Sequence, residues 1–133
     1  MNRVAQSVGK WLATYLSKEL EIDGTAPPSN PLHLQAILQA GDVLLVEGNT
    51  RLSGAIKYLT QSTWSHAALC IGDTLGPAPE GEEPRVLVDV DVVEGVRTIP
   101  LSAFAGMHTR ICRPVGLSEA EIDALVAFML ERR

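Results

Sequence analysis

The 133-residue sequence is poor in aromatic residues and in cysteine. Phe, Trp and Tyr make up 5% of the chain, which gives no indication of a platform where sugars or bases stack. The two cysteines, Cys70 and Cys112, form no Cys-x-x-Cys pair, so neither a zinc ribbon nor a disulfide framework is expected. No apolar run resembles a signal peptide or a membrane span. This composition predicts a one-domain cytoplasmic protein.

Positive charge is also scarce. Eleven Lys and Arg stand against 16 Asp and Glu, so the formal net charge is −5. No basic cluster interleaves with aromatic residues, which argues against a nucleic-acid partner. The three histidines, His33, His66 and His108, lack the spacing of metal ligands. We therefore expect neither a metal nor another cofactor.

Residues 2–20 carry apolar side chains at spacings of three and four, which predicts an amphipathic helix. The stripe comprises Val4, Val8, Trp11, Leu12, Tyr15, Leu16 and Leu20. We favour docking of this stripe on the domain. The alternatives are attachment to a membrane surface, aided by Arg3, Lys10 and Lys18, and a contact surface for a partner. The proposed divisions are a helix at 1–23, a proline-rich linker at 24–31 and the main domain at 32–133.

The remaining pattern alternates short strands with helices and predicts an α+β fold, a small antiparallel sheet or partial barrel with packed helices. A capping box, Ser118 with Glu121, opens the last helix. The predicted helices are Leu32–Gln39, Leu52–Thr60 and Ser118–Arg133. The predicted strands are Val43–Glu47, the apolar run that begins at His66, Arg85–Val93, Gly95–Ile99 and Thr109–Pro114.

His66 begins an apolar run that reads as a buried strand. A histidine fixed beside a cleft is a candidate acid or base, because its free pKa lies nearest neutrality. The alternative is a structural, hydrogen-bonded residue. Ser62, Thr63 and Ser65 precede it and would either supply hydroxyls to a cleft or form a turn.

Two carboxylates lie two residues apart on the strand 85–93. Strand alternation places Leu87, Asp89 and Asp91 on one face. A carboxylate that reaches the histidine would fix its tautomer, and we prefer Asp89 over Asp91 for this contact. The alternative is that both face solvent at a sheet edge.

The order of features from Gly41 to Pro114 resembles the circularly permuted papain-like amidases. These form the permuted branch of the NlpC-type cysteine peptidase superfamily, which includes relatives of lecithin retinol acyltransferase. The resemblance rests on a Gly-Asp before a hydrophobic strand, a helix with a Ser/Thr turn and a Ser-His strand, an acidic strand before Gly-Val-x-x-x-Pro-Leu, and an Arg-Pro strand. In this sequence these pieces are Gly41–Leu45, Thr60–Ile71, Asp89 with Gly95–Leu101, and Arg110–Pro114.

The resemblance implies that a cysteine thiolate attacks an amide or ester carbonyl of a peptide or lipid. His66 would be the general base and Asp89 or Asp91 would orient it, where the family usually has Glu. Asp42, Ser62 and Ser65 are candidates for the substrate side of the site. Asp42 serves equally well as a turn carboxylate that accepts backbone N–H groups.

Neither cysteine suits the role of nucleophile, which the resemblance places after the histidine at a helix start. Cys70 is four residues beyond His66 on one strand, roughly 13 Å away by strand rise. Cys112 lies in a predicted strand. We therefore expect the nucleophile beyond Arg133, so that the domain is incomplete at its C-terminal side and inactive alone. A complementing C-terminal fragment or a homo-oligomer is then a candidate partner. The alternative is a non-catalytic binding module that retains the fold.

Overall fold

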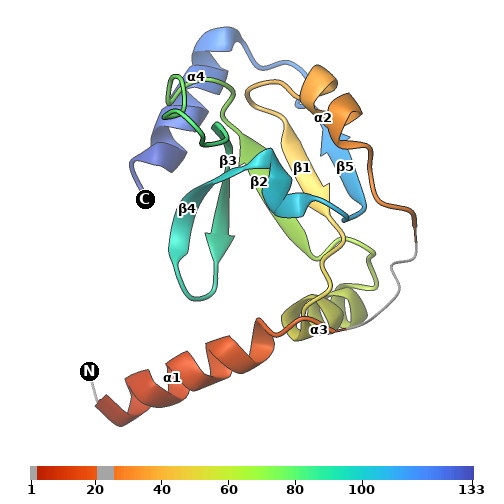
Figure 1. Ribbon diagram of the computed structural model, residues 1–133, viewed down its shortest axis with the longest axis vertical. Coiled ribbons are helices and arrows are strands. Elements are labelled where there is room, and N and C mark those ends of the chain that lie inside the picture. Colours follow the sequence, from red (N-terminus) through yellow and green to blue (C-terminus); the bar gives the residue numbers. More distant parts are fainter. Residues whose placement is uncertain (1–2, 21–25) are drawn as a thin grey trace.

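The computed structural model describes residues 3–20 and 26–133 (Figure 1). Its centre is a five-stranded antiparallel sheet with the strand order β4-β3-β2-β1-β5. The strands are β1 Val43–Val46, β2 His66–Cys70, β3 Arg85–Asp91, β4 Gly95–Pro100 and β5 Thr109–Cys112. β1 pairs with both β2 and β5, which come from distant parts of the sequence. The expected α+β class with a small antiparallel sheet is confirmed.

Helices cover the sheet and extend from one end of it. They are α1 Arg3–Leu16, α2 Pro31–Ile37, α3 Arg51–Thr60, the 3-10 helix η1 Leu101–Phe104 and α4 Glu119–Leu130. All but η1 lie within a few residues of a predicted helix. Ser118 and Glu121 form the expected capping box at the start of α4. The division into parts at 1–23, 24–31 and 32–133 stays a prediction, because residues 1–2 and 21–25 lie outside the described ranges and Pro31 already begins α2.

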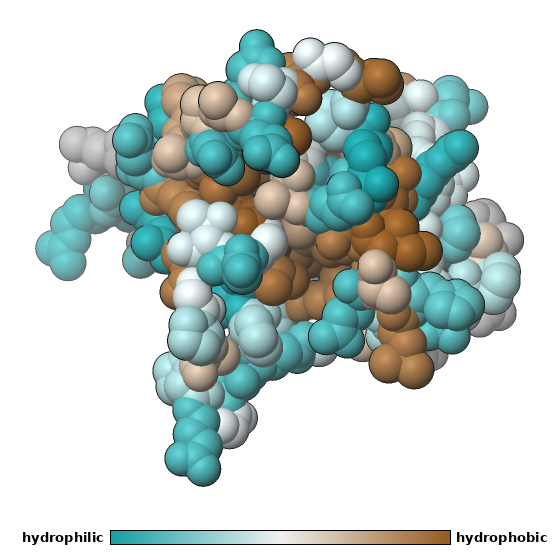
Figure 2. Space-filling view, turned by 90° about the horizontal axis from the view of Figure 1, so that it is seen from above, coloured by the Kyte–Doolittle hydropathy of each residue, from teal (hydrophilic) through white to brown (hydrophobic). Residues whose placement is uncertain are grey.

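The two faces of the sheet pack against different helices. Leu44, Leu87 and Phe104 belong to a buried cluster that α2 and η1 cover. Val88, adjacent to Leu87, packs with Val126 of α4 in a second cluster on the other face. Hydrophobic side chains also reach the surface in the middle of the face seen from above, between hydrophilic ones (Figure 2). The side chain of His66 shares the first face, the one that α2 and η1 cover.

Helix α1 departs from the expectation. Its apolar side chains are exposed, with exposed fractions of 56% for Val8, 67% for Trp11 and 48% for Tyr15. Figure 1 shows α1 projecting from the body of the molecule, below the β3–β4 hairpin in that view. The prediction that the stripe docks on the domain is therefore wrong. Amphipathic spacing shows that a helix has an apolar side but not what covers it. Within the described residues, no helix is long and apolar enough to cross a bilayer.

We predict that Leu44→Ala destabilises the fold by about 2–5 kcal/mol, because Leu44 is fully buried in β1 and its removal leaves a cavity. Leu59→Ala is the matched control, since Leu59 is 79% exposed on α3 and its truncation is expected to cost less than about 0.5 kcal/mol. Urea denaturation of the three proteins measures both effects. Equal losses for the two variants would contradict the described core.

Candidate active site

His66 is the first residue of β2, and its backbone lies opposite Val46 of β1. The ladder between β2 and β3 includes the pairs Leu69–Val88 and Cys70–Leu87, toward the other end of β2. At the His66 end, a side-chain hydrogen bond joins the two strands instead: His66 Nε2 lies 2.9 Å from Asp89 Oδ2. The sequence therefore brings together two of the residues singled out above, 23 positions apart.

The partner of Nε2 determines the tautomer of His66. An ionised carboxylate only accepts hydrogen bonds, so Nε2 carries the hydrogen that it donates to Asp89. In the neutral ring, Nδ1 then keeps its lone pair. The His66 side chain is 31% exposed, whereas that of Asp89 is fully buried. The ring is thus held at Nε2 by a buried carboxylate, and Nδ1 has a lone pair that can accept a proton.

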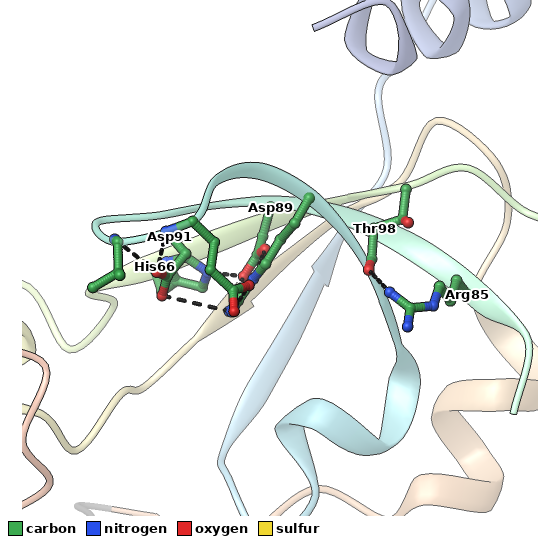
Figure 3. A network of polar contacts seen from close by, with 8 residues as sticks. His66, Arg85, Asp89, Asp91 and Thr98 are labelled. Atoms are coloured by element: carbon green, nitrogen blue, oxygen red, sulfur yellow. Dashed lines mark hydrogen bonds and ion pairs between the residues drawn. The ribbon is translucent and has the colours of Figure 1, made fainter. Parts of the chain in front are cut away.

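Arg97 of β4 is the second partner of Asp89. The two residues lie directly opposite each other in the β3–β4 ladder. Arg97 Nε donates to Asp89 Oδ1 at 2.8 Å, and Nη2 donates to Oδ2 at 3.3 Å. Figure 3 shows the polar network to which this contact belongs, with His66, Asp89 and Asp91 gathered at one end. The Asp89 carboxylate is therefore held by a guanidinium on one side and by the imidazole on the other.

These partners keep Asp89 ionised despite its burial. Burial alone raises the pKa of this carboxyl, but the hydrogen bonds from His66 and Arg97 outweigh it and bring the pKa below its usual value. The same contact raises the pKa of Arg97 above its ordinary value. Asp89 is consequently a fixed negative charge at neutral pH, able to orient the ring of His66.

Asp91 has other hydrogen-bond partners than Asp89. Its Oδ1 accepts hydrogen bonds from the backbone N–H groups of Val93 and Glu94 at 2.8 and 2.9 Å, which lowers the pKa of Asp91. Its Oδ2 lies 3.6 Å from Arg97 Nη1. The carboxylate thus closes the β3–β4 turn. The assignment of Asp91 as a residue that orients His66 is therefore corrected: of the two carboxylates on this face, Asp89 makes the contact.

Asp42 lies at the other end of the sheet. Its backbone is hydrogen-bonded to Cys70, four residues along β2 from His66 and roughly 13 Å away by strand rise. Its buried carboxylate accepts two hydrogen bonds of 2.8 Å from Arg113 and one of 2.8 Å from the backbone N–H of Gln39. The hydrogen bond from Arg113 is the main cause that lowers the pKa of Asp42. The substrate-side assignment of Asp42 is thus corrected to a structural one.

Ser62 and Ser65 also differ in the hydrogen bonds that they make. Ser62 Oγ accepts from the backbone N–H of Trp64 at 3.1 Å, which is the turn-forming role. Ser65 Oγ accepts from the backbone N–H of Gly48 at 3.0 Å and lines the same cavity as His66. Of the two serines, only Ser65 therefore lines the cavity beside His66.

The cavity beside His66 has a volume of about 430 Å³. Its walls come from β1, α3, the β3–β4 hairpin and η1, and they include Asp89 and Arg97. Phe104 of η1 also lines it, with its ring centroid 5.7 Å from that of His66. The wall therefore combines an apolar ring with the imidazole of His66. Among residues 3–20 and 26–133, no three His, Cys, Asp or Glu side chains are grouped as a metal site.

Both cysteines lie away from this cavity. Cys70 is buried at the far end of β2, and burial raises the pKa of its thiol. Cys112 is exposed on β5 opposite Val43, whereas His66 is opposite Val46, about 10 Å farther along the strands. Neither thiol is among the residues that line the cavity. The nucleophile that the resemblance calls for is thus not beside His66 in the described chain.

A model of one protein family matches residues 37–129, which is more than half of the chain and includes the whole sheet. The model describes permuted papain-like amidase enzymes, YaeF/YiiX, C92 family. The chain belongs to this family. No curated protein and no solved structure matches the chain. His66, Asp89 and Arg97 all lie within the matched region, which is therefore an amidase-type domain of permuted papain-like kind, whereas α1 lies outside it.

We predict that Asp89→Asn destabilises this amidase-type domain by about 1–3 kcal/mol at pH 7, because the three hydrogen bonds from His66 and Arg97 lose their charged acceptor and an amide has only one oxygen to accept them. The folded-state pKa of Asp89 is lowered, so its contribution is complete above the unfolded value of about 4 and disappears as the pH falls through the folded value. Urea denaturation at pH 7, 5 and 3 should therefore show the two proteins converging at low pH.

Asp123→Asn is the matched control for this series, since Asp123 is exposed on α4. Its substitution is expected to change stability by less than about 0.5 kcal/mol at each pH. A difference between wild type and Asp89→Asn that is the same at pH 3 as at pH 7 would contradict an ionised, hydrogen-bonded Asp89.

We predict that iodoacetamide modifies Cys112 in the folded protein and Cys70 only after unfolding. Cys112 is exposed, whereas Cys70 is covered and its thiol pKa is raised by burial. Intact-mass spectrometry should show one carbamidomethyl group on the native protein and a second in urea. In Cys112→Ser the native protein should stay unmodified; labelling of Cys70 in that folded variant would contradict its burial.

Proposed function

We propose that this chain supplies the general base and its orienting acid to a cysteine hydrolase or acyl transferase. The observation that carries the proposal is the hydrogen bond between His66 Nε2 and the buried Asp89 at the wall of a cavity. In this proposal the substrate is an amide or ester of a peptide or lipid, and no cofactor takes part. A cytoplasmic location and the absence of a nucleic-acid partner stay predictions from composition.

In this proposal each ring nitrogen of His66 has its own role. Nδ1 of His66 takes the proton of a thiol, and the thiolate forms a C–S bond with the substrate carbonyl carbon. As the tetrahedral intermediate collapses, the C–N or C–O bond breaks and Nδ1–H returns the proton to the leaving group, which leaves a thioester. Water, deprotonated by His66 in turn, then releases the acid and the thiol. Asp89 stabilises the imidazolium through both steps, and Arg97 holds Asp89 in place.

The attacking thiol in this proposal is neither Cys70 nor Cys112. Both lie away from the cavity, and rebuilding the sheet to bring either to His66 would break the ladders of β1 with β2 and β5. We propose that the thiol belongs to a segment outside residues 1–133, in the same polypeptide or in a partner. The chain alone is then inactive toward its substrate.

A second candidate function is a binding module without catalysis. The absence of either thiol from the wall of the His66 cavity favours it. In that case the cavity would hold a carbonyl compound, and His66 would only donate or accept a hydrogen bond.

A small thiol added in solution separates these two functions. The cavity volume of about 430 Å³ admits 2-mercaptoethanol together with a p-nitrophenyl ester. If His66 is a base, the protein should accelerate transfer of the acyl group to the thiol, with release of p-nitrophenol and saturation in both reactants. General-base catalysis typically accelerates a reaction by about 10²–10⁴-fold, so we predict that His66→Gln lowers the protein-dependent rate of thiolysis by about 100-fold.

His33→Gln is the matched control, because His33 is exposed on α2 and away from the cavity. It should thiolyse the ester as fast as the wild-type chain. Equal rates for wild type and His66→Gln would overturn the catalytic proposal and leave the binding module.

A further inference from the structure

The exposed apolar side of α1 is the surface that the fold and the site leave unexplained. Val8, Trp11, Leu12 and Tyr15, which we call the α1 stripe, have exposed fractions between 46% and 67%. The rings of Trp11 and Tyr15 stack on each other, with centroids 5.8 Å apart. Four large apolar side chains gathered on one helix face are more than the isolated exposed residues usual on a protein surface.

One end of α1 is fixed to the body of the protein. The guanidinium of Arg51, at the start of α3, lies 4.0 Å from the centre of the Tyr15 ring. Just after the helix, the backbone N–H of Arg51 donates to Lys18 O at 3.1 Å, and that of Leu20 donates to Asn49 O at 2.7 Å. The exposed stripe thus belongs to a helix with a defined attachment.

The charge of this helix is opposite to that of the rest of the chain. Residues 1–18 contain three basic side chains, Arg3, Lys10 and Lys18, and no acidic one. The remaining residues carry eight basic side chains against 16 acidic ones. A basic helix with an apolar stripe is attracted to a negatively charged lipid surface, which the rest of the chain would repel.

We infer that α1 lies in the plane of an anionic membrane surface, with its stripe inserted among the lipid headgroups. Trp and Tyr favour this depth, because each has an apolar ring and one polar atom. Arg3, Lys10 and Lys18 would contact lipid phosphates and carboxylates. A 14-residue helix is about 21 Å long, shorter than the hydrocarbon core, so it lies on the bilayer and does not cross it.

A second copy of the chain fits this surface less well. Val4, Val8, Trp11 and Tyr15 follow coiled-coil spacing for fewer than two heptads, and coiled coils require about three or more. The residues beside them include Ser7 and Thr14, which offer no opposite charges for pairing two such helices.

The inference goes beyond the proposed function, since it concerns where the domain is located and not its chemistry. The position of α1 also relates it to the His66 cavity. Ser17, which directly follows α1, lines that cavity. The C-terminal end of α1 is therefore adjacent to this cavity.

Co-sedimentation of the whole chain with lipid vesicles tests the inference. One set contains phosphatidylcholine with 30% phosphatidylserine, and the other phosphatidylcholine alone. We expect binding to the anionic vesicles, at least about tenfold weaker binding to the neutral ones, and a loss of binding as salt is raised. Trp11→Asp should reduce binding to the anionic vesicles by at least about tenfold, because it places a carboxylate in the stripe.

Gln6→Asp is the matched control. It makes the same change of charge on the polar side of α1, where the carboxylate stays in water, so most of the binding should remain. The absence of binding to anionic vesicles would overturn the inference, and so would equal losses in the two variants. Sedimentation-equilibrium ultracentrifugation without lipid supplies a further check: a wild-type dimer that Trp11→Asp dissociates would overturn the inference in favour of self-association.

Discussion

The site depends on one buried carboxylate. Asp89 is fully enclosed, and a carboxylate in such a place is stable only when its oxygens are hydrogen-bonded. Arg97 binds both oxygens and His66 binds one of them. His66 and Arg97 together hold the pKa of Asp89 below its usual value against the effect of burial, and Asp89 in turn fixes the hydrogen of the His66 ring on Nε2. The β3–β4 hairpin supplies the geometry, since it places Asp89 opposite Arg97.

Membership in the permuted papain-like amidases indicates amidase-type chemistry. The geometry of His66 and Asp89 is compatible with the proton-transfer part of that chemistry. A histidine that donates from Nε2 to an orienting group and accepts at Nδ1 is suited to deprotonate a thiol. Both thiols of the chain, however, are positioned by the sheet itself, one at the far end of β2 and one on β5. His66 and Asp89 are thus positioned independently of both thiols, so the proposed base can be tested with a thiol from solution.

The sequence predicts the order and type of nearly all elements, because alternation and capping are local signals. It also places Asp89 and Asp91 on one face, but alternation cannot tell which of them reaches His66. Arg97 was missed although the signal was present: a hairpin that turns at residues 92–94 sets position 97 opposite position 89, an oppositely charged pair. Asp42 was misassigned because its partner Arg113 is 71 residues away, a contact that only the pairing of β1 with β5 creates. Similarly, the pattern of α1 defines its stripe but contains no information on what covers it.

The most direct test of this account is the tautomer of His66, measured by long-range ¹H–¹⁵N correlation NMR of the imidazole at a pH where the ring is neutral. The account predicts that Nε2 carries the hydrogen and Nδ1 does not, and that Asp89→Asn weakens this preference while leaving the spectra of His33 and His108 unchanged. A neutral His66 with its hydrogen on Nδ1, or the same tautomer distribution in wild type and Asp89→Asn, would contradict the claim that the buried carboxylate fixes the base.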